Sequence, residues 1–165
     1  LIFHSLSKRS NLPGLRSGFV AGGPHSIAAM KQLRAYAGAP LPNPLQAVAV
    51  RAWDDEVHVE ANRALYAPKY VLADRLLGNT PGHTSPEAGF CLWLRVPDGQ
   101  TGEATALSLW KRAGLRVLPG AYLARDTDAG NPGDAYIRVA MVAEMEVLDP
   151  ALTRLAAELD LMRSA

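Results

Sequence analysis

The sequence contains one cysteine, almost no net charge and no long apolar run, and each shortage excludes a class of protein. Cys91 is the only cysteine among 165 residues, so no disulfide forms within the chain, and its apolar surroundings favour a small buried residue over a reactive thiol. Lys and Arg number 17 and Asp and Glu 16, a net charge of +1 that provides no electrostatic attraction to nucleic acid or to an anionic membrane surface. No apolar run approaches the roughly 18 residues of a membrane span. We therefore expect neither nucleic acid nor a membrane as a partner.

Two further shortages concern the N-terminus and metal ligands. The chain begins at Leu1, without an initiating Met, directly in an apolar run, and it shows no charged leader followed by a hydrophobic segment and a small-residue cleavage site. We expect a cytoplasmic protein, and we expect this chain to be the C-terminal part of something longer. His25, His58 and His83 have no carboxylate or cysteine partners at ligand spacing, so we expect no metal site.

What the sequence does contain is the composition of a packed globular protein, with 48% apolar and 20% charged residues. Short apolar runs separated by turn residues predict strands over 1–6 and 17–23, and a helix follows over 24–36. Asn43 and Pro44 form a cap and first turn, which predicts a helix that continues until Pro68 breaks or kinks it. A second helical stretch then reaches Leu77.

The second half of the chain follows a Gly/Pro/Ser-rich segment, residues 78–89, that has the composition of a linker. After it, the patterns predict strands near 90–96, 115–120 and 136–142 and helices bracketed by Thr101 and Gly114 and by residues 149–162. The order β-α-β-β-α predicts an α/β layer arrangement in which helices bury one face of a sheet.

Three residues near the N-terminus, Ser5, Lys8 and Arg16, have the chemistry needed to hold an aldehyde cofactor that carries a phosphate. A lysine amine condenses with an aldehyde to a Schiff base, a serine hydroxyl donates to phosphate oxygens, and an arginine clamps a phosphate through two nitrogens. The same residue types in a Ser/Gly/Pro-rich loop are also common as solvated surface. From the residues alone, both interpretations stay open.

The order of these residues resembles the lysine segment of the fold-type I aminotransferases of class I/II, which depend on pyridoxal 5'-phosphate. In that segment, Ser-x-x-Lys is followed eight residues later by an arginine within a "PGxRxG" sequence, and "SLSK" and "PGLRSG" match it throughout. The resemblance implies that Ser5 and Arg16 bind the cofactor phosphate and that Lys8 forms the Schiff base. Ser7, directly before the lysine, is also expected to reach the cofactor.

A second candidate residue, Arg138, stands within the apolar strand "YIRVAMV". A charge is costly to bury unless it is paired, so something anionic should meet this arginine. An ordinary salt bridge, or a position on the solvent face of the sheet, would explain it equally well. In the aminotransferases, an arginine at the start of the last strand of the small domain receives the α-carboxylate of the substrate, and Arg138 resembles it in motif and in distance from the lysine.

The two matches imply a domain organisation as well as a site. By the resemblance, residues 1–42 are the C-terminal part of the large cofactor-binding domain, residues 43–77 form the connecting helix or helices, and residues 78–165 form the small α/β domain. The chain then corresponds to the last two-fifths of such an enzyme. The aspartate that protonates the pyridine nitrogen, and the other cofactor residues upstream of the lysine, fall outside it, so we expect this portion alone to be inactive or nearly so.

The segments "RVLPGAYLAR", "GNPG" and "IRVAMV" are most similar to N-succinyldiaminopimelate aminotransferase of lysine biosynthesis. That resemblance implies N-succinyl-LL-2,6-diaminopimelate as amino donor, 2-oxoglutarate as acceptor, glutamate as the second product and a homodimer. The alternatives are another class I/II aminotransferase, a related carbon-sulfur lyase or a ligand-sensing regulator domain. A non-catalytic C-terminal fragment that serves only folding or dimerisation also stays open.

Overall fold

The computed structural model describes residues 1–164 and divides the chain into two compact units. Unit 1 comprises Leu1–Ala64, and unit 2 begins at Leu65. The helix α4 (Val57–Leu77) carries the chain from the first unit into the second. None of the helices within residues 1–164 is long and apolar enough to cross a membrane.

Unit 1 opens with a two-stranded antiparallel pair that confirms the two predicted strands. In chain order, its first elements are β1 (Ile2–Ser5), α1 (Leu6–Arg9), the 3-10 turn η1 (Pro13–Leu15) and β2 (Gly18–Ala21). The register pairs Ser5 with Gly18 where β1 ends and β2 begins. A Cβ atom at Gly18 would lie 2.4 Å from the carbonyl oxygen of His4, so only glycine permits this close approach of the two backbones.

The helices of unit 1 agree with the sequence patterns except at one junction. The helix α2 (Pro24–Tyr36) has the predicted bounds, but α3 (Asn43–Asp54) ends well before Pro68. The expectation that the helix from Asn43 runs to Pro68 is therefore wrong, because α4 starts after a break and continues through that proline. The carboxylate of Asp55 accepts a hydrogen bond from the first backbone N–H of α4 at 2.9 Å, which favours a new helix start over continuation of α3.

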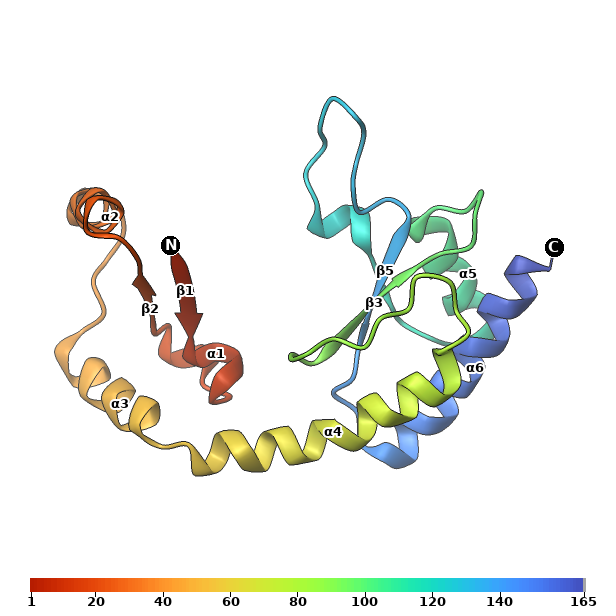
Figure 1. Cartoon of the computed structure of the whole chain (residues 1–165), viewed down its shortest axis with the longest axis horizontal. Coiled ribbons are helices and arrows are strands. Elements are labelled where there is room, and N and C mark those ends of the chain that lie inside the picture. The colour runs from red at the N-terminus through yellow and green to blue at the C-terminus, as the bar shows by residue number, and fades with distance from the viewer. Residues whose placement is uncertain (165) are drawn as a thin grey trace. The chain divides into compact units, whose positions relative to one another are not determined.

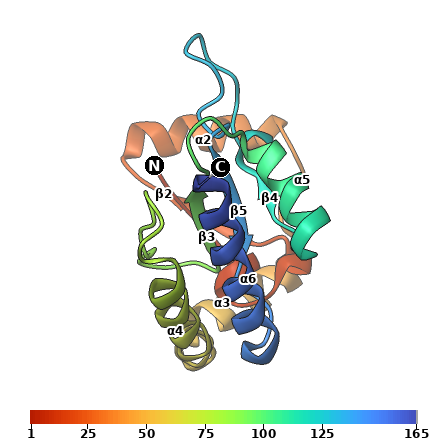
Figure 2. The ribbon, with the colours of Figure 1, turned by 90° about the vertical axis from the view of Figure 1, so that its right-hand side faces the viewer.

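Unit 2 is an α/β layer in the predicted order. Its elements after α4 are β3 (Cys91–Arg95), α5 (Gly102–Ala113), β4 (Leu118–Pro119), the 3-10 turn η2 (Gly120–Leu123), β5 (Tyr136–Ala140) and α6 (Met145–Arg163). The strands form an antiparallel sheet of order β3-β5-β4. In Figure 2, α6 lies in front of β3 and β5 and α5 lies to its right, and Figure 1 shows the long loop before β5 projecting away from the sheet.

Both predicted caps of α5 are confirmed, whereas α6 begins earlier than expected. The Thr101 hydroxyl accepts a hydrogen bond from the backbone N–H of Ala104 at 3.1 Å, and Gly114 ends α5 with a left-handed φ of 66°. The last helix begins at Met145 rather than at 149. Pro150 lies inside this helix, where its missing N–H removes one backbone hydrogen bond.

One face of the sheet is buried and the other is open. In β3, Leu92 and Leu94 are each 1% exposed, whereas the residues between and beside them are partly or fully exposed. The buried face packs against α4, α5 and α6 and forms a continuous apolar core, which includes Leu72, Leu77, Leu109, Ile137, Met141, Leu152, Leu155 and Leu159. The opposite face, which we call the open sheet face, carries Cys91, Trp93, Arg95, Leu118, Tyr136, Arg138 and Ala140.

Candidate active site

Lys8 lies on a short helix and not in the loop that the sequence patterns predicted. The helix α1 begins directly after β1, and the Oγ atom of Ser5 caps it by accepting a hydrogen bond from the backbone N–H of Ser7 at 3.1 Å. Leu6 is fully buried, whereas Lys8 is exposed. The helix is thus seated by one apolar side chain and presents the lysine on its outer side.

The antiparallel pair brings Ser5 and Arg16 to the same end of the hairpin. Ser5 stands opposite Gly18, and its hydroxyl donates to the backbone oxygen of Ser17 at 3.4 Å. This contact is long for an O–H···O hydrogen bond, so the proton of Ser5 is not firmly committed to it. Arg16 precedes Ser17 in the chain, so Ser5 and Arg16 flank the same end of the hairpin, with Lys8 three residues after Ser5.

Arg16 adopts a backbone conformation that is unusual for its type. Its φ is 54° and its ψ 33°, the left-handed region, which costs a residue other than glycine roughly 1 to 2 kcal/mol. The guanidinium donates to the backbone oxygen of Pro13 at 2.8 Å, and no carboxylate within residues 1–164 pairs with it. Most of its five N–H donors are thus available to an anion. Local strain of this kind is characteristic of ligand-binding loops.

The helix that carries Lys8 is anchored through the next residue, Arg9. Its guanidinium donates to the backbone oxygen of Ala52 at 2.8 Å and to that of Trp53 at 3.4 Å, and it forms an ion pair with Glu56. Its Cζ atom also lies 4.9 Å from the centre of the Trp53 ring. Arg9 is thus bound at the C-terminal end of α3, where carbonyl groups without helical partners attract a cation.

A histidine adds a second attachment at the same place. The Nε2 atom of His58 lies 2.8 Å from the hydroxyl of Ser10, and its Nδ1 atom lies 3.0 Å from the carboxylate of Asp55. The hydrogen bond from His58, and then the one from the first backbone N–H of α4, lower the pKa of Asp55. No local sequence pattern predicts the contacts of Arg9 with Glu56 or of His58 with Ser10, because these residues lie almost fifty positions apart.

Arg138 lies in β5 on the open sheet face. Its side chain is partly buried, while its neighbours Ile137 and Val139 point into the core. The ordinary salt bridge that the sequence left open is not formed, since the guanidinium makes no hydrogen bond, ion pair or ring contact with any described residue. Arg138 therefore has no anionic partner among residues 1–164, and it lies on the face of the sheet that the core does not cover.

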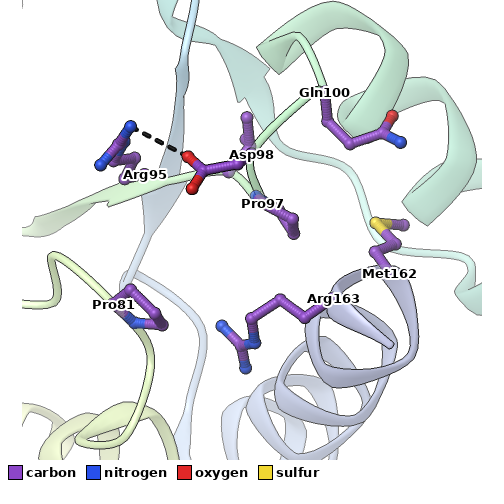
Figure 3. A pocket seen from close by; sticks show the side chains of 8 residues that line it. Pro81, Arg95, Pro97, Asp98, Gln100, Met162 and Arg163 are labelled. Atoms are coloured by element: carbon purple, nitrogen blue, oxygen red, sulfur yellow. Dashed lines mark hydrogen bonds and ion pairs between the residues drawn. The ribbon is translucent and has the colours of Figure 1, made fainter. Parts of the chain in front are cut away.

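Two other features of unit 2 have structural explanations. The hydroxyl of Tyr122 donates to the carboxylate of Glu103 at 2.8 Å, and this hydrogen bond raises the pKa of Tyr122. A separate pocket near the end of α6 contains none of the predicted site residues, and the Arg95 guanidinium at its edge already pairs with Asp98 at 3.0 Å (Figure 3). The residues that line it are Pro81, Arg95, Val96, Pro97, Asp98, Gln100, Met162 and Arg163.

Comparison with known proteins gives one consistent result. The family model "Aminotransferase class I and II" matches residues 1–155. The chain is 38% identical over 158 residues to 4-dedimethylamino-4-oxo-anhydrotetracycline transaminase of Streptomyces rimosus, covering 94% of this chain and 41% of that protein. It is 31% identical over 158 residues to LL-diaminopimelate aminotransferase of Dehalococcoides mccartyi, covering 93% of this chain and 39% of that protein.

Solved structures agree in fold. An aminotransferase from Neisseria meningitidis has a TM-score of 0.81 at 44% identity, covering 95% of this chain and 40% of that one. A probable N-succinyldiaminopimelate aminotransferase from Thermus thermophilus has a TM-score of 0.77 at 26% identity, covering 95% of this chain and 41% of that one. The chain thus spans about two-fifths of the length of these relatives, which fits the expected C-terminal portion of the fold. The chain belongs to the class I and II aminotransferase family.

Proposed function

We propose that this chain is the C-terminal portion of an aminotransferase that depends on pyridoxal 5'-phosphate, with Lys8 as its catalytic lysine. The observation that carries the proposal is the arrangement in unit 1. Ser5 and Arg16 flank one end of the hairpin, and Lys8 follows on a helix that Arg9 anchors. Family membership supports the same reaction.

The residues present fit the cofactor. Arg16 has N–H donors that no described carboxylate occupies, and Ser5 at the same end of the hairpin has a hydroxyl, which together are donor types that bind phosphate. Lys8 is exposed, so a small molecule can reach it, and Ser7 lies beside it. We assign phosphate binding to Ser5 and Arg16, covalent attachment to the Nζ atom of Lys8, and a supporting contact to Ser7.

The chemistry of the site follows from these assignments. Lys8, whose amine would hold the cofactor, would also move a proton at the substrate Cα atom. When bound, the cofactor stores the electron pair that this proton leaves behind. Arg138 binds the α-carboxylate of the substrate and orients the Cα atom, since its guanidinium has no partner among residues 1–164 and matches a carboxylate through two N–H groups.

We further propose that the complete enzyme transfers the amino group between N-succinyl-LL-2,6-diaminopimelate and 2-oxoglutarate, in lysine biosynthesis. The names of the Thermus thermophilus and Dehalococcoides mccartyi relatives, which both refer to diaminopimelate, support this choice. In the same proposal, residues 1–42 belong to the large domain, residues 43–77 connect the domains, residues 78–165 form the small domain, and the enzyme is a cytoplasmic homodimer.

The test is the visible absorbance of the complete protein, of which this chain is the C-terminal portion, after reconstitution with pyridoxal 5'-phosphate. We expect a band of the lysine-bound cofactor that disappears in Lys8→Ala and persists in the matched control Lys31→Ala, on the exposed side of α2. Succinyl-diaminopimelate should remove the band and 2-oxoglutarate should restore it.

Other results would change the proposal in defined ways. A band that depends on Lys8 but responds to neither compound would retain cofactor binding and refute the substrate pair. A band that survives in Lys8→Ala would refute the assignment of the catalytic lysine.

A second candidate is a non-catalytic association unit, which the exposure of β1 favours. Leu1, Ile2 and Phe3 are 58%, 63% and 66% exposed. An apolar strand this exposed is expected to pair with further protein. Sedimentation of the 165-residue chain by itself tests this, because we expect oligomers without transaminase activity.

A further inference from the structure

The open sheet face of unit 2 presents an exposed tryptophan next to Arg138. The register of β3 and β5 places Trp93 directly opposite Arg138, so the two side chains leave the sheet on the same face. Cross-strand neighbours of this kind have Cβ atoms roughly 4.5 to 5.5 Å apart. Trp93 is 43% exposed, although both of its neighbours in β3 are almost completely buried.

The indole of Trp93 is held in place despite its exposure. Its ring stacks on that of Tyr136, with centroids 5.4 Å apart and planes inclined by 17°. Its edge lies against the backbone of Gly120, where an added Cβ atom would come within 2.8 Å of the indole Cη2 atom. A large apolar surface is thus fixed in one orientation, which lowers the entropic cost of packing a ligand against it.

The guanidinium of Arg138 makes no ring contact with the indole of Trp93. No cation–π contact joins Arg138 to Trp93 in the part of the chain that the structure describes, and the guanidinium has no anionic partner there. An unpaired cation next to a fixed apolar wall matches a ligand that has a carboxylate at one end and a hydrocarbon chain attached to it.

We propose that Trp93 determines substrate specificity, by packing against the aliphatic side chain of an amino donor whose α-carboxylate is bound by Arg138. The substrate class is therefore α-amino acids with several consecutive side-chain methylenes, of which the diaminopimelate derivative is one. The inference rests on the proposed function, because it takes Arg138 as the carboxylate-binding residue. The competing occupants of the indole are the remainder of the enzyme and a second copy of this chain.

The test measures kcat/KM of the complete enzyme for 2-aminobutanoate, 2-aminopentanoate, 2-aminohexanoate and 2-aminoheptanoate, which differ by one methylene each. Full burial of a methylene corresponds to about a fourfold gain, so we expect up to that increase per step. In Trp93→Ala, the increase in kcat/KM with each methylene should vanish, while kcat/KM for 2-aminobutanoate should change little. Trp93→Phe should retain part of the increase. Trp110→Ala, at an exposed tryptophan of α5, should leave the series unchanged.

A second readout separates this inference from the proposed function. In this chain with Trp53→Phe and Trp110→Phe, Trp93 is the one remaining tryptophan, so the tryptophan fluorescence reports on it alone. Hexanoate should shift this emission far more than acetate does. Adding Arg138→Gln should abolish the difference. A shift of this kind with all amino donors inert would support the binding face and refute transamination. An unchanged methylene series in Trp93→Ala, or an emission that does not respond to hexanoate, would overturn the inference.

Discussion

Substituting Arg9 tests whether the helix that carries Lys8 is held by its attachment to the end of α3. In Arg9→Ala, the chain loses two hydrogen bonds to backbone carbonyls, a ring contact with Trp53 and an ion pair with Glu56. The Arg9 side chain is only 15% exposed, whereas that of Glu56 is 61% exposed. The contacts to the carbonyls and the ring should therefore matter more than the ion pair.

The expected magnitude follows from these contacts. Hydrogen bonds from a charged donor contribute about 1.5 to 3 kcal/mol, and a partly exposed cation–π contact adds about 0.5 to 1 kcal/mol. An exposed ion pair contributes at most about 1 kcal/mol. Because such terms are not additive, we expect Arg9→Ala to lower the free energy of opening α1 by about 2 to 4 kcal/mol.

Hydrogen exchange of the 165-residue chain measures this opening directly. The backbone N–H of Ser10 donates to the oxygen of Leu6 at 3.1 Å and reports on α1. Exchange of this N–H should accelerate roughly 30- to 900-fold in Arg9→Ala, which corresponds to the expected loss of free energy. In the matched control Glu56→Gln, which removes only the ion pair, the acceleration should be less than about sixfold. Equal acceleration in the two variants would show that the ion pair holds the helix, and no acceleration in Arg9→Ala would refute the anchoring.

Two further predictions concern stability. Leu109 is fully buried and Leu107 is 51% exposed on the same helix. We therefore expect Leu109→Ala to lower the free energy of unfolding of unit 2 by about 2 to 5 kcal/mol and Leu107→Ala to lower it by less than about 0.5 kcal/mol. Urea unfolding measures both. Equal effects would mean that α5 does not pack as described. The hydrogen bond from His58 lowers the pKa of Asp55 below its ordinary 3.8, so its contribution to stability is present above that pH and is lost as the pH falls through the lowered value. An NMR titration of the carboxyl carbon should therefore give a midpoint below 3.8 in the native chain, and a midpoint at or above 3.8 would contradict the contact.

Local chemistry explains why parts of the fold could be predicted. The caps of α5 depend on a threonine and a glycine at its two ends, and the turns depend on proline, glycine and asparagine, whose preferences act within a few residues. The break after α3 also had a local signal, since Asp55 is a residue that starts helices. The predicted end of the helix from Asn43 relied on Pro68 instead of Asp55, and that boundary was therefore wrong.

The sequence by itself determined the class of the fold and the order of its elements, and the resemblance of its lysine segment to that of the class I/II aminotransferases indicated the family. These depend on short-range patterns that a chain carries with it in any conformation. Only the tertiary structure decided that Arg9 anchors the lysine helix and that Trp93 stands beside Arg138. Such contacts join residues far apart in sequence, and they exist only once strand pairing and helix packing have set their register.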